Sequence, residues 1–276
     1  MTFGVVGLGL IGGSIAKALY ALEGAKVYAF DSDRTTLDRA FLQNAVSKEL
    51  TEKNIGECDY IFLALYPGDV ISYIQKYGKY ISKNAVALDC SGTKRKVCEK
   101  CFDIAEKYGF HFIGGHPMAG TQFSGFKYSR ASMFANSKML IIPSKDEKIE
   151  VLQSLKDVLL KIGFKGITIT TPQEHDRIIA FTSQLAHVVS NAYVKSPNAK
   201  VHDGFSAGSY RDLTRVARLN SKMWTELFLE NADNLTFEID RLISELQKYS
   251  DAIKKGDEKL LFDLLEEGTR LKESID

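Results

Sequence analysis

The first 170 residues alternate between short apolar runs and longer amphipathic stretches. Runs of strand length occur at residues 2–8, 26–31, 60–65, 85–89, 111–114, 139–143 and 166–170, with a weaker candidate at 45–46. Patterns with the helical period separate most of them, at residues 13–22, 34–43, 68–80, 94–108 and 147–162. Strands that alternate with helices predict an α/β domain with a doubly wound, mostly parallel sheet covered on both faces.

The pattern changes at residue 171. Thr171, Pro172 and Glu174 stand at the N-cap, first and third positions expected of a helix start. Beyond this point there is no convincing strand pattern, and helical patterns run over residues 173–194, 210–219, 222–254 and 258–272. The sequence therefore predicts an α/β domain over residues 1–170 and an all-α domain over residues 171–276.

The helix expected over residues 222–254 is too long to bury its apolar stripe within so small a domain. The stripe comprises Leu227, Leu235, Ile239, Leu242 and Leu246. We expect these side chains to pack against a second subunit, so that the helical domain makes a homodimer.

Composition narrows the classes of function. Hydrophobic residues make up 45% and charged residues 26% of the chain, as in globular proteins. The 36 basic residues nearly balance 35 acidic ones, so there is no general field to capture nucleic acid or an anionic membrane. No targeting segment or membrane-spanning apolar run is apparent, which predicts a cytoplasmic protein. Cys98 and Cys101 form a C-x-x-C without further ligands nearby, so we expect reduced cysteines and no metal.

A glycine motif lies between the first strand and the first helix, where residues 7–13 read GLGLIGG. Gly7 permits a tight turn, Gly9 lets a diphosphate approach the backbone, and Gly12 lets the helix pack against the strand. The diphosphate would meet N–H groups of the first helical turn, which includes Leu10 and Ile11. This context predicts a Rossmann domain that binds a nicotinamide dinucleotide.

Asp31 ends the second strand of this unit. A carboxylate there accepts a hydrogen bond from the adenosine ribose and repels a 2′-phosphate, which favours NAD over NADP. Arg34 leaves the strictness of this preference open, although we interpret it as a solvated arginine in the first turn of its helix.

Two further segments carry candidate chemistry. His116 follows the strand at residues 111–114, at the sheet edge where open α/β folds bind ligands. Histidine suits a general base because its unperturbed pKa is about 6.5. In the second segment, Arg211 and Arg215 share a helical face with Asp212 beside them, which favours binding of a carboxylate.

Several motifs together resemble the TyrA family of prephenate and arogenate dehydrogenases. They are the glycine motif, GGHPMAGT at residues 114–121, HD with TSQLAH at residues 175–187, and YRDLTRVA with MW at residues 210–224. The resemblance runs over nearly the whole chain. It implies a Rossmann domain with a helical dimerisation domain, and NAD-dependent oxidative decarboxylation of prephenate in tyrosine biosynthesis. In that reaction the cyclohexadienyl ring gives up a hydride, loses CO2 and becomes aromatic.

The resemblance also implies roles for residues at matching positions. His116 takes the proton of the ring hydroxyl, Arg215 binds a substrate carboxylate, and Asp212 holds that arginine in place. Trp224 matches a tryptophan of the family, and both the site and the subunit interface stay open for it. We expect His175, near the start of its helix, to be structural.

The chain departs from the family pattern around two of these motifs. Gly92 stands where the family often has a serine that contacts the histidine and the cofactor, so Ser91 or Thr93 is left to supply a hydroxyl. Gln184 replaces a histidine implicated in substrate binding and can still donate and accept hydrogen bonds. His187 stays open between core and site.

Gln122 bears on the choice of substrate, because some members of the family carry a glutamate there. Arogenate bears an ammonium where prephenate bears a keto group, and a neutral amide offers no counter-charge. We therefore favour prephenate, with arogenate as the alternative. A β-hydroxyacid dehydrogenase or imine reductase is a rival, although no lysine occurs between residues 171 and 193 to act as its base. A redox-sensing NAD-binding module without turnover is the non-enzyme alternative.

Overall fold

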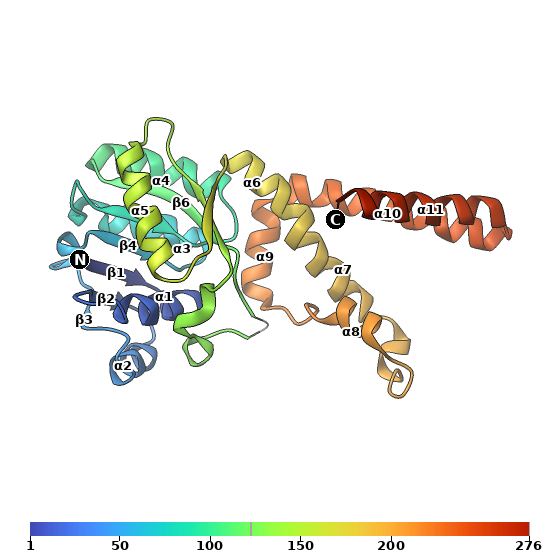
Figure 1. The fold of residues 1–276 in the computed structure, drawn as a ribbon, viewed down its shortest axis with the longest axis horizontal. Helices are drawn as coiled ribbons and strands as arrows, with labels where there is room; N and C mark the ends of the chain where they lie inside the picture. Colours follow the sequence, from blue (N-terminus) through green and yellow to red (C-terminus); the bar gives the residue numbers. More distant parts are fainter. Residues whose placement is uncertain (122, 276) are drawn as a thin grey trace.

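The computed structural model describes residues 1–121 and 123–275. An eight-stranded sheet occupies the first part of the chain and helices occupy the rest (Figure 1). The strands are β1 (Thr2–Val6), β2 (Lys26–Phe30), β3 (Lys48–Glu49), β4 (Tyr60–Leu63), β5 (Val86–Asp89), β6 (His111–Pro117), β7 (Lys138–Ile142) and β8 (Gly166–Ile169). Their order is β3-β2-β1-β4-β5-β6-β7-β8, and every neighbouring pair is parallel except β6 with β7. The predicted doubly wound, mostly parallel sheet is confirmed.

Helices cover both faces of the sheet because its strands are apolar on both sides. In β4, Tyr60 and Phe62 point into one core, whereas Ile61 and Leu63 point into the other. The α-helices of this part are α1 (Leu10–Tyr20), α2 (Arg34–Leu42), α3 (Pro67–Tyr77), α4 (Arg95–Tyr108) and α5 (Ile149–Lys161). Helices α1, α2 and α5 contribute to the first core, and α3 and α4 to the second.

The second part of the chain is helical, as predicted. Its helices are α6 (Pro172–Ile179), α7 (Ala186–Tyr193), α8 (Gly208–Thr214), α9 (Ser221–Glu230), α10 (Ala232–Lys255) and α11 (Glu258–Ile275). A π-helical segment, Ala180–Leu185, joins α6 to α7, so the three form one continuous rod. The pair α10 and α11 projects away from the sheet (Figure 1). Among residues 1–121 and 123–275, no helix is both long and apolar enough to cross a membrane.

Several element boundaries differ from the sequence prediction. The short edge strand is Lys48–Glu49 and not the predicted 45–46; Ala45 and Val46 are buried ahead of it. Strand β6 continues through His116 to Pro117 instead of ending at residue 114. The helix expected over residues 222–254 breaks at Asn231, whose side chain turns inward to hydrogen-bond the rod.

The predicted subunit-facing stripe is partly wrong. Leu227 and Leu235 are buried within the chain, and Leu227 lies against Gly92 of the sheet domain. Ile239 and Leu242 are half-buried, whereas Leu246 is 58% exposed. Large apolar side chains are nevertheless exposed along both projecting helices, namely Phe237, Ile243, Leu246 and Ile253 on α10 and Leu260, Phe262, Leu265 and Leu271 on α11.

Polar contacts join the helices to the sheet domain at the start of α4. Arg95 pairs with Asp233 at 2.5 Å and donates to Oδ1 of Asn231 at 3.1 Å. The amide nitrogen of Asn231 donates to the carbonyl oxygen of Asp176 and to Oε1 of Gln184, both at 2.8 Å. Asn231 is fully buried, so its side chain ties α4, α6 and the π-helical segment together.

We predict that Asn231→Ala lowers the free energy of unfolding by about 2 kcal/mol, because it leaves several buried polar groups without partners. Urea unfolding followed by circular dichroism measures the loss. Asn198→Ala, at an exposed asparagine of the same domain, is the matched control and should leave stability unchanged. Equal stability of the two variants would show that Asn231 does not tie the helices together.

Candidate functional site

The glycine turn between β1 and α1 has the geometry of a diphosphate site. Gly7 has a φ of 85°, and a Cβ there would lie 2.6 Å from the carbonyl oxygen of Ala64. A Cβ on Gly12 would lie 1.8 Å from the carbonyl oxygen of Gly7. Gly9, by contrast, faces open space at the N-cap of α1, with Leu10 and Ile11 in the first turn. Free N–H groups and open space at a helix N-terminus suit a diphosphate.

Asp31 lies beside this turn, directly after β2. Its carboxylate accepts hydrogen bonds from the backbone N–H of Leu8 at 2.6 Å and of Asp33 at 2.8 Å. Arg34 is exposed and pairs instead with Asp38 at 2.9 Å and Glu49 at 2.7 Å. These two carboxylates already compensate the charge of Arg34, which weakens the case for it as a phosphate ligand.

His116 sits where β6 extends past the end of β5. Strand β6 pairs with β5 as far as Ile113, and from Gly114 it pairs with β7, so that His116 lies opposite Leu140. Gly115 allows β6 to pass this close to the end of β5, because a Cβ there would lie 2.3 Å from the carbonyl oxygen of Asp89. The glycines before His116 therefore serve close packing inside a strand.

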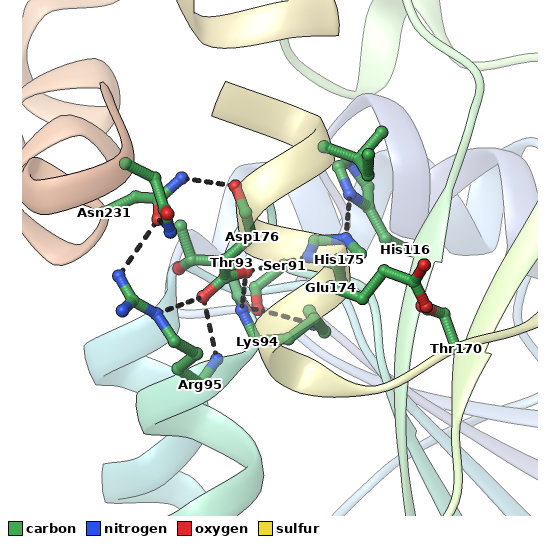
Figure 2. A network of polar contacts seen from close by, with 12 residues as sticks. Ser91, Thr93, Lys94, Arg95, His116, Thr170, Glu174, His175, Asp176 and Asn231 are labelled. Carbon is green, nitrogen blue, oxygen red and sulfur yellow. Dashed lines mark hydrogen bonds and ion pairs between the residues drawn. The ribbon is translucent and has the colours of Figure 1, made fainter. Parts of the chain in front are cut away.

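A chain of hydrogen bonds leads from His116 to the helical domain (Figure 2). Nδ1 of His116 lies 2.9 Å from Nε2 of His175, and Nδ1 of His175 lies 2.8 Å from Oδ1 of Asp176. His175 and Asp176 are both buried at the start of α6. His175 thus contacts the candidate base directly. The sequence analysis expected only a structural role for His175 and did not predict this contact.

Asp176 also caps α4 of the sheet domain. Its Oδ1 accepts from the backbone N–H of Lys94 at 2.8 Å, and its Oδ2 from that of Arg95 at 3.0 Å. The Arg95 Nε adds a bond to the same Oδ2 at 3.3 Å. A carboxylate at a helix N-terminus satisfies free N–H groups and complements the helix dipole. Here that carboxylate comes from the other domain.

A buried ion pair lies against the backbone of β6 at Gly115. Nζ of Lys94 is 2.5 Å from Oδ1 of Asp89, and both side chains are fully buried. Lys94 also donates to the carbonyl oxygen of Gly115 at 2.7 Å, and Asp89 accepts from the N–H of Gly115 at 3.1 Å. The pair therefore binds both the carbonyl oxygen and the N–H of Gly115, the residue directly before His116.

These surroundings keep His116 and His175 neutral and Asp176 charged. Burial lowers the pKa of His116 well below its usual value, and the nearby His175 and Lys94 lower it further. Burial also lowers the pKa of His175, against the opposing effect of Asp176. Burial alone would raise the pKa of Asp176, but bonds from His175 and from the backbone of Arg95 bring it below the usual value.

Ser91, Thr93 and Gln184 each form hydrogen bonds within the chain. Ser91 donates its hydroxyl to Asp89 at 2.6 Å, and Thr93 donates to Glu230 of α9 at 2.7 Å. Gln184 is buried; besides accepting from Asn231, it donates to the carbonyl oxygen of Leu227 at 3.1 Å. The proposed roles of Ser91 at the cofactor and Gln184 at the substrate stay predictions.

Arg215 and Asp212 line a groove of about 320 Å³ beside α8. Its other lining residues are mostly apolar and come from the rod, from α8 and from Val216 just after α8. Arg211 is exposed on α8, and Arg215 directly follows that helix. Among the described residues, no hydrogen bond or ion pair joins Asp212 to Arg215 or brings either one to His116. The carboxylate-binding role stays a prediction, and Gln122 lies outside the described residues.

His187 and Trp224 lie close to this groove. Their rings are tilted by 31° to each other with centroids 4.0 Å apart, and Nδ1 of His187 donates to the carbonyl oxygen of Ser183 at 2.8 Å. Burial lowers the pKa of His187, and the charge of Arg215 lowers it further. His187 is half-buried near Arg215, and Trp224, also half-buried, packs against His187 and Phe228. The roles of both residues stay predictions.

Family models match both parts of this chain. The prephenate dehydrogenase nucleotide-binding domain matches residues 15–168, and the prephenate dehydrogenase dimerization domain matches residues 171–267. The chain belongs to the prephenate dehydrogenase family. It is therefore an oxidoreductase of that family, and the dinucleotide-binding domain expected from the glycine motif is confirmed.

Relatives in this family differ in their named substrates. The cyclohexadienyl dehydrogenase of Zymomonas mobilis is 26% identical over 96% of this chain and 93% of its own length. The structure of prephenate dehydrogenase from Aquifex aeolicus, a complex with hydroxyphenyl propionate and NAD+, matches with a TM-score of 0.86 and 26% identity, covering 100% of this chain and 98% of that one. Synechocystis arogenate dehydrogenase matches with a TM-score of 0.82 and 25% identity over 100% of both chains.

We predict that Lys94→Met in this dehydrogenase lowers the free energy of unfolding by about 3 kcal/mol, because Asp89 would stay buried without its counter-charge. Urea unfolding measures the loss, and Lys100→Met on the exposed face of the same helix is the control. A Lys94→Met protein as stable as the control would contradict the role given to the buried pair.

Proposed function

We propose that the enzyme catalyses the NAD-dependent oxidative decarboxylation of prephenate to 4-hydroxyphenylpyruvate. The observation that carries this proposal is His116, a half-buried imidazole held neutral beyond the end of β5. Its strand, β6, lies in the same sheet as β1, which leads into the glycine turn. His175 of the helical domain contacts Nδ1 of its ring. The NAD+ bound to the Aquifex aeolicus relative supports the choice of cofactor, as does the carboxylate of Asp31.

The chemistry requires one group that accepts a proton and one that holds the substrate. When bound, NAD supplies the hydride acceptor. As the C–H bond of the ring breaks, the hydroxyl proton moves toward the imidazole of His116, which leaves electron density on the oxygen. The bond to CO2 breaks as the ring becomes aromatic, and the proton returns to the phenolic oxygen of the product. A neutral imidazole can accept that proton, whereas an imidazolium cannot.

Arg215 is our candidate for the substrate carboxylate, since its guanidinium is exposed in the groove beside α8. We also propose that two copies of the chain associate through the helical domain. The apolar side chains exposed along α10 and α11 support this, together with the match to a dimerization domain. The cytoplasmic location expected from the sequence stays a prediction.

Prephenate is favoured over arogenate by Gln122, whose neutral amide offers no charge to pair with the arogenate ammonium. The named activities of the relatives include both substrates, so this choice depends on the chain's own residue.

We predict a higher kcat/KM for prephenate than for arogenate, and for NAD than for NADP. Absorbance of the reduced cofactor, measured for the four combinations, tests both preferences. Gln122→Glu should shift the ratio toward arogenate. A wild-type enzyme that prefers arogenate would contradict the substrate proposal, and cofactor binding without turnover of either substrate would favour a redox-sensing module.

We predict that kcat/KM for prephenate stays constant down to a pH below 6.5 before it falls. Activity needs neutral His116, and burial places the pKa of His116 below the ordinary 6.5, so the base becomes protonated only at lower pH. The pH profile of the free enzyme reports this pKa. A fall in kcat/KM centred at or above pH 6.5 would mean that a different group or an unperturbed histidine is the base.

A further inference from the structure

The hydrogen bonds behind His116 determine which nitrogen of each imidazole carries the proton. Asp176 is ionised, because its pKa is lowered, and its carboxylate can then only accept hydrogen bonds. The 2.8 Å contact therefore requires a proton on Nδ1 of His175. His175 is neutral, since burial lowers its pKa, so its Nε2 carries a lone pair.

The protonation of His175 in turn determines that of His116. A lone pair on Nε2 of His175 requires a donor at 2.9 Å, which is Nδ1–H of His116. His116 is neutral as well, so its proton occupies Nδ1 and its Nε2 has a free lone pair. His175, a residue of the other domain, therefore determines that Nε2 of His116 is the atom free to accept a proton.

We propose that His175 and Asp176 are a positioning pair that makes Nε2 of His116 the proton-accepting atom. This inference rests on the proposed function of His116 as the base. In the proton step, the substrate O–H bond breaks and an N–H bond forms at Nε2 of His116, while Nδ1 keeps its proton and its hydrogen bond to His175. The imidazolium that forms is then held by a neutral acceptor backed by the carboxylate of Asp176.

The hydroxyls near His116 do not compete for this role. The family's usual serine position is Gly92, and the hydroxyls of Ser91 and Thr93 donate to carboxylates elsewhere. The charged groups around the pair are Lys94 and Asp89, which form their own ion pair, and Arg95, which contacts the far oxygen of Asp176. Within the described part of the chain, His175 provides the polar side-chain contact to Nδ1 of His116.

The wild-type protein provides the direct test. The chain has five histidines, and 15N-edited spectra of the imidazole nitrogens at neutral pH distinguish the two neutral tautomers of each. Spectra of His116→Asn and His175→Gln assign the two rings. We expect both His116 and His175 to carry the proton on Nδ1. A proton on Nε2 of His116 would overturn the proposal, whatever the variants do.

Two variants separate positioning from general packing. His175→Gln keeps an acceptor near the place of Nε2, whereas His175→Leu removes it. We expect His175→Leu to lower kcat about 100-fold without a matching change in KM or in NAD affinity, and to release His116 from its single tautomer. His175→Gln should retain the tautomer of His116 and most of the turnover. His111→Gln, on the same strand and bonded to Glu147, is the matched control with unchanged kinetics.

The outcomes distinguish this inference from the proposed function. If His116→Asn keeps normal turnover, His116 is not the base, and the function proposed for it fails even if the tautomers are as expected. If His116→Asn is inactive but His175→Leu has wild-type kcat, the positioning pair alone is refuted. Circular dichroism and thermal unfolding show whether His175→Leu is folded, and if it is not, the wild-type tautomers and His175→Gln decide.

Discussion

The carboxylate of Asp176 is the interaction on which the arrangement of this site depends. It accepts from the backbone N–H groups of Lys94 and Arg95 at the start of α4, and it also accepts from Nδ1 of His175. One buried charge therefore satisfies a helix N-terminus in the sheet domain and orients an imidazole of the helical domain. A buried carboxylate costs several kcal/mol in desolvation unless such donors surround it. Because its donors come from both domains, any shift between them would disturb the imidazole as well.

This constraint links stability and chemistry. The main chain of Asp176 accepts a bond from Asn231, and the side chain of Asn231 also holds Gln184 in the π-helical segment. In the sheet domain, Lys94 and Asp89 form hydrogen bonds to the backbone of Gly115. His116 is thus held from both domains, and its surroundings lower the pKa of its imidazole. The groove with Arg215 lies farther along the rod, between the rod and α8.

Local sequence patterns were sufficient for much of the fold and for part of the site. Strands and helices of the sheet domain follow from periodicity, and the tight approaches at Gly7 and Gly12 follow from the motif. Asp176 could not be recognised as a helix cap, since the N–H groups that it caps are 82 and 81 positions away in the chain. The break at Asn231 was hidden for a similar reason: the partners that draw its side chain inward lie 55 and 47 positions away.

A crystal structure of the enzyme with NAD and 4-hydroxyphenylpyruvate is the most direct test of the central claim. We expect the phenolic oxygen of the product within hydrogen-bonding distance of Nε2 of His116, about 2.6–3.2 Å. His175 would still contact Nδ1 on the opposite side of the same ring. A phenolic oxygen bound by another side chain, with Nε2 of His116 turned away from it, would contradict the account.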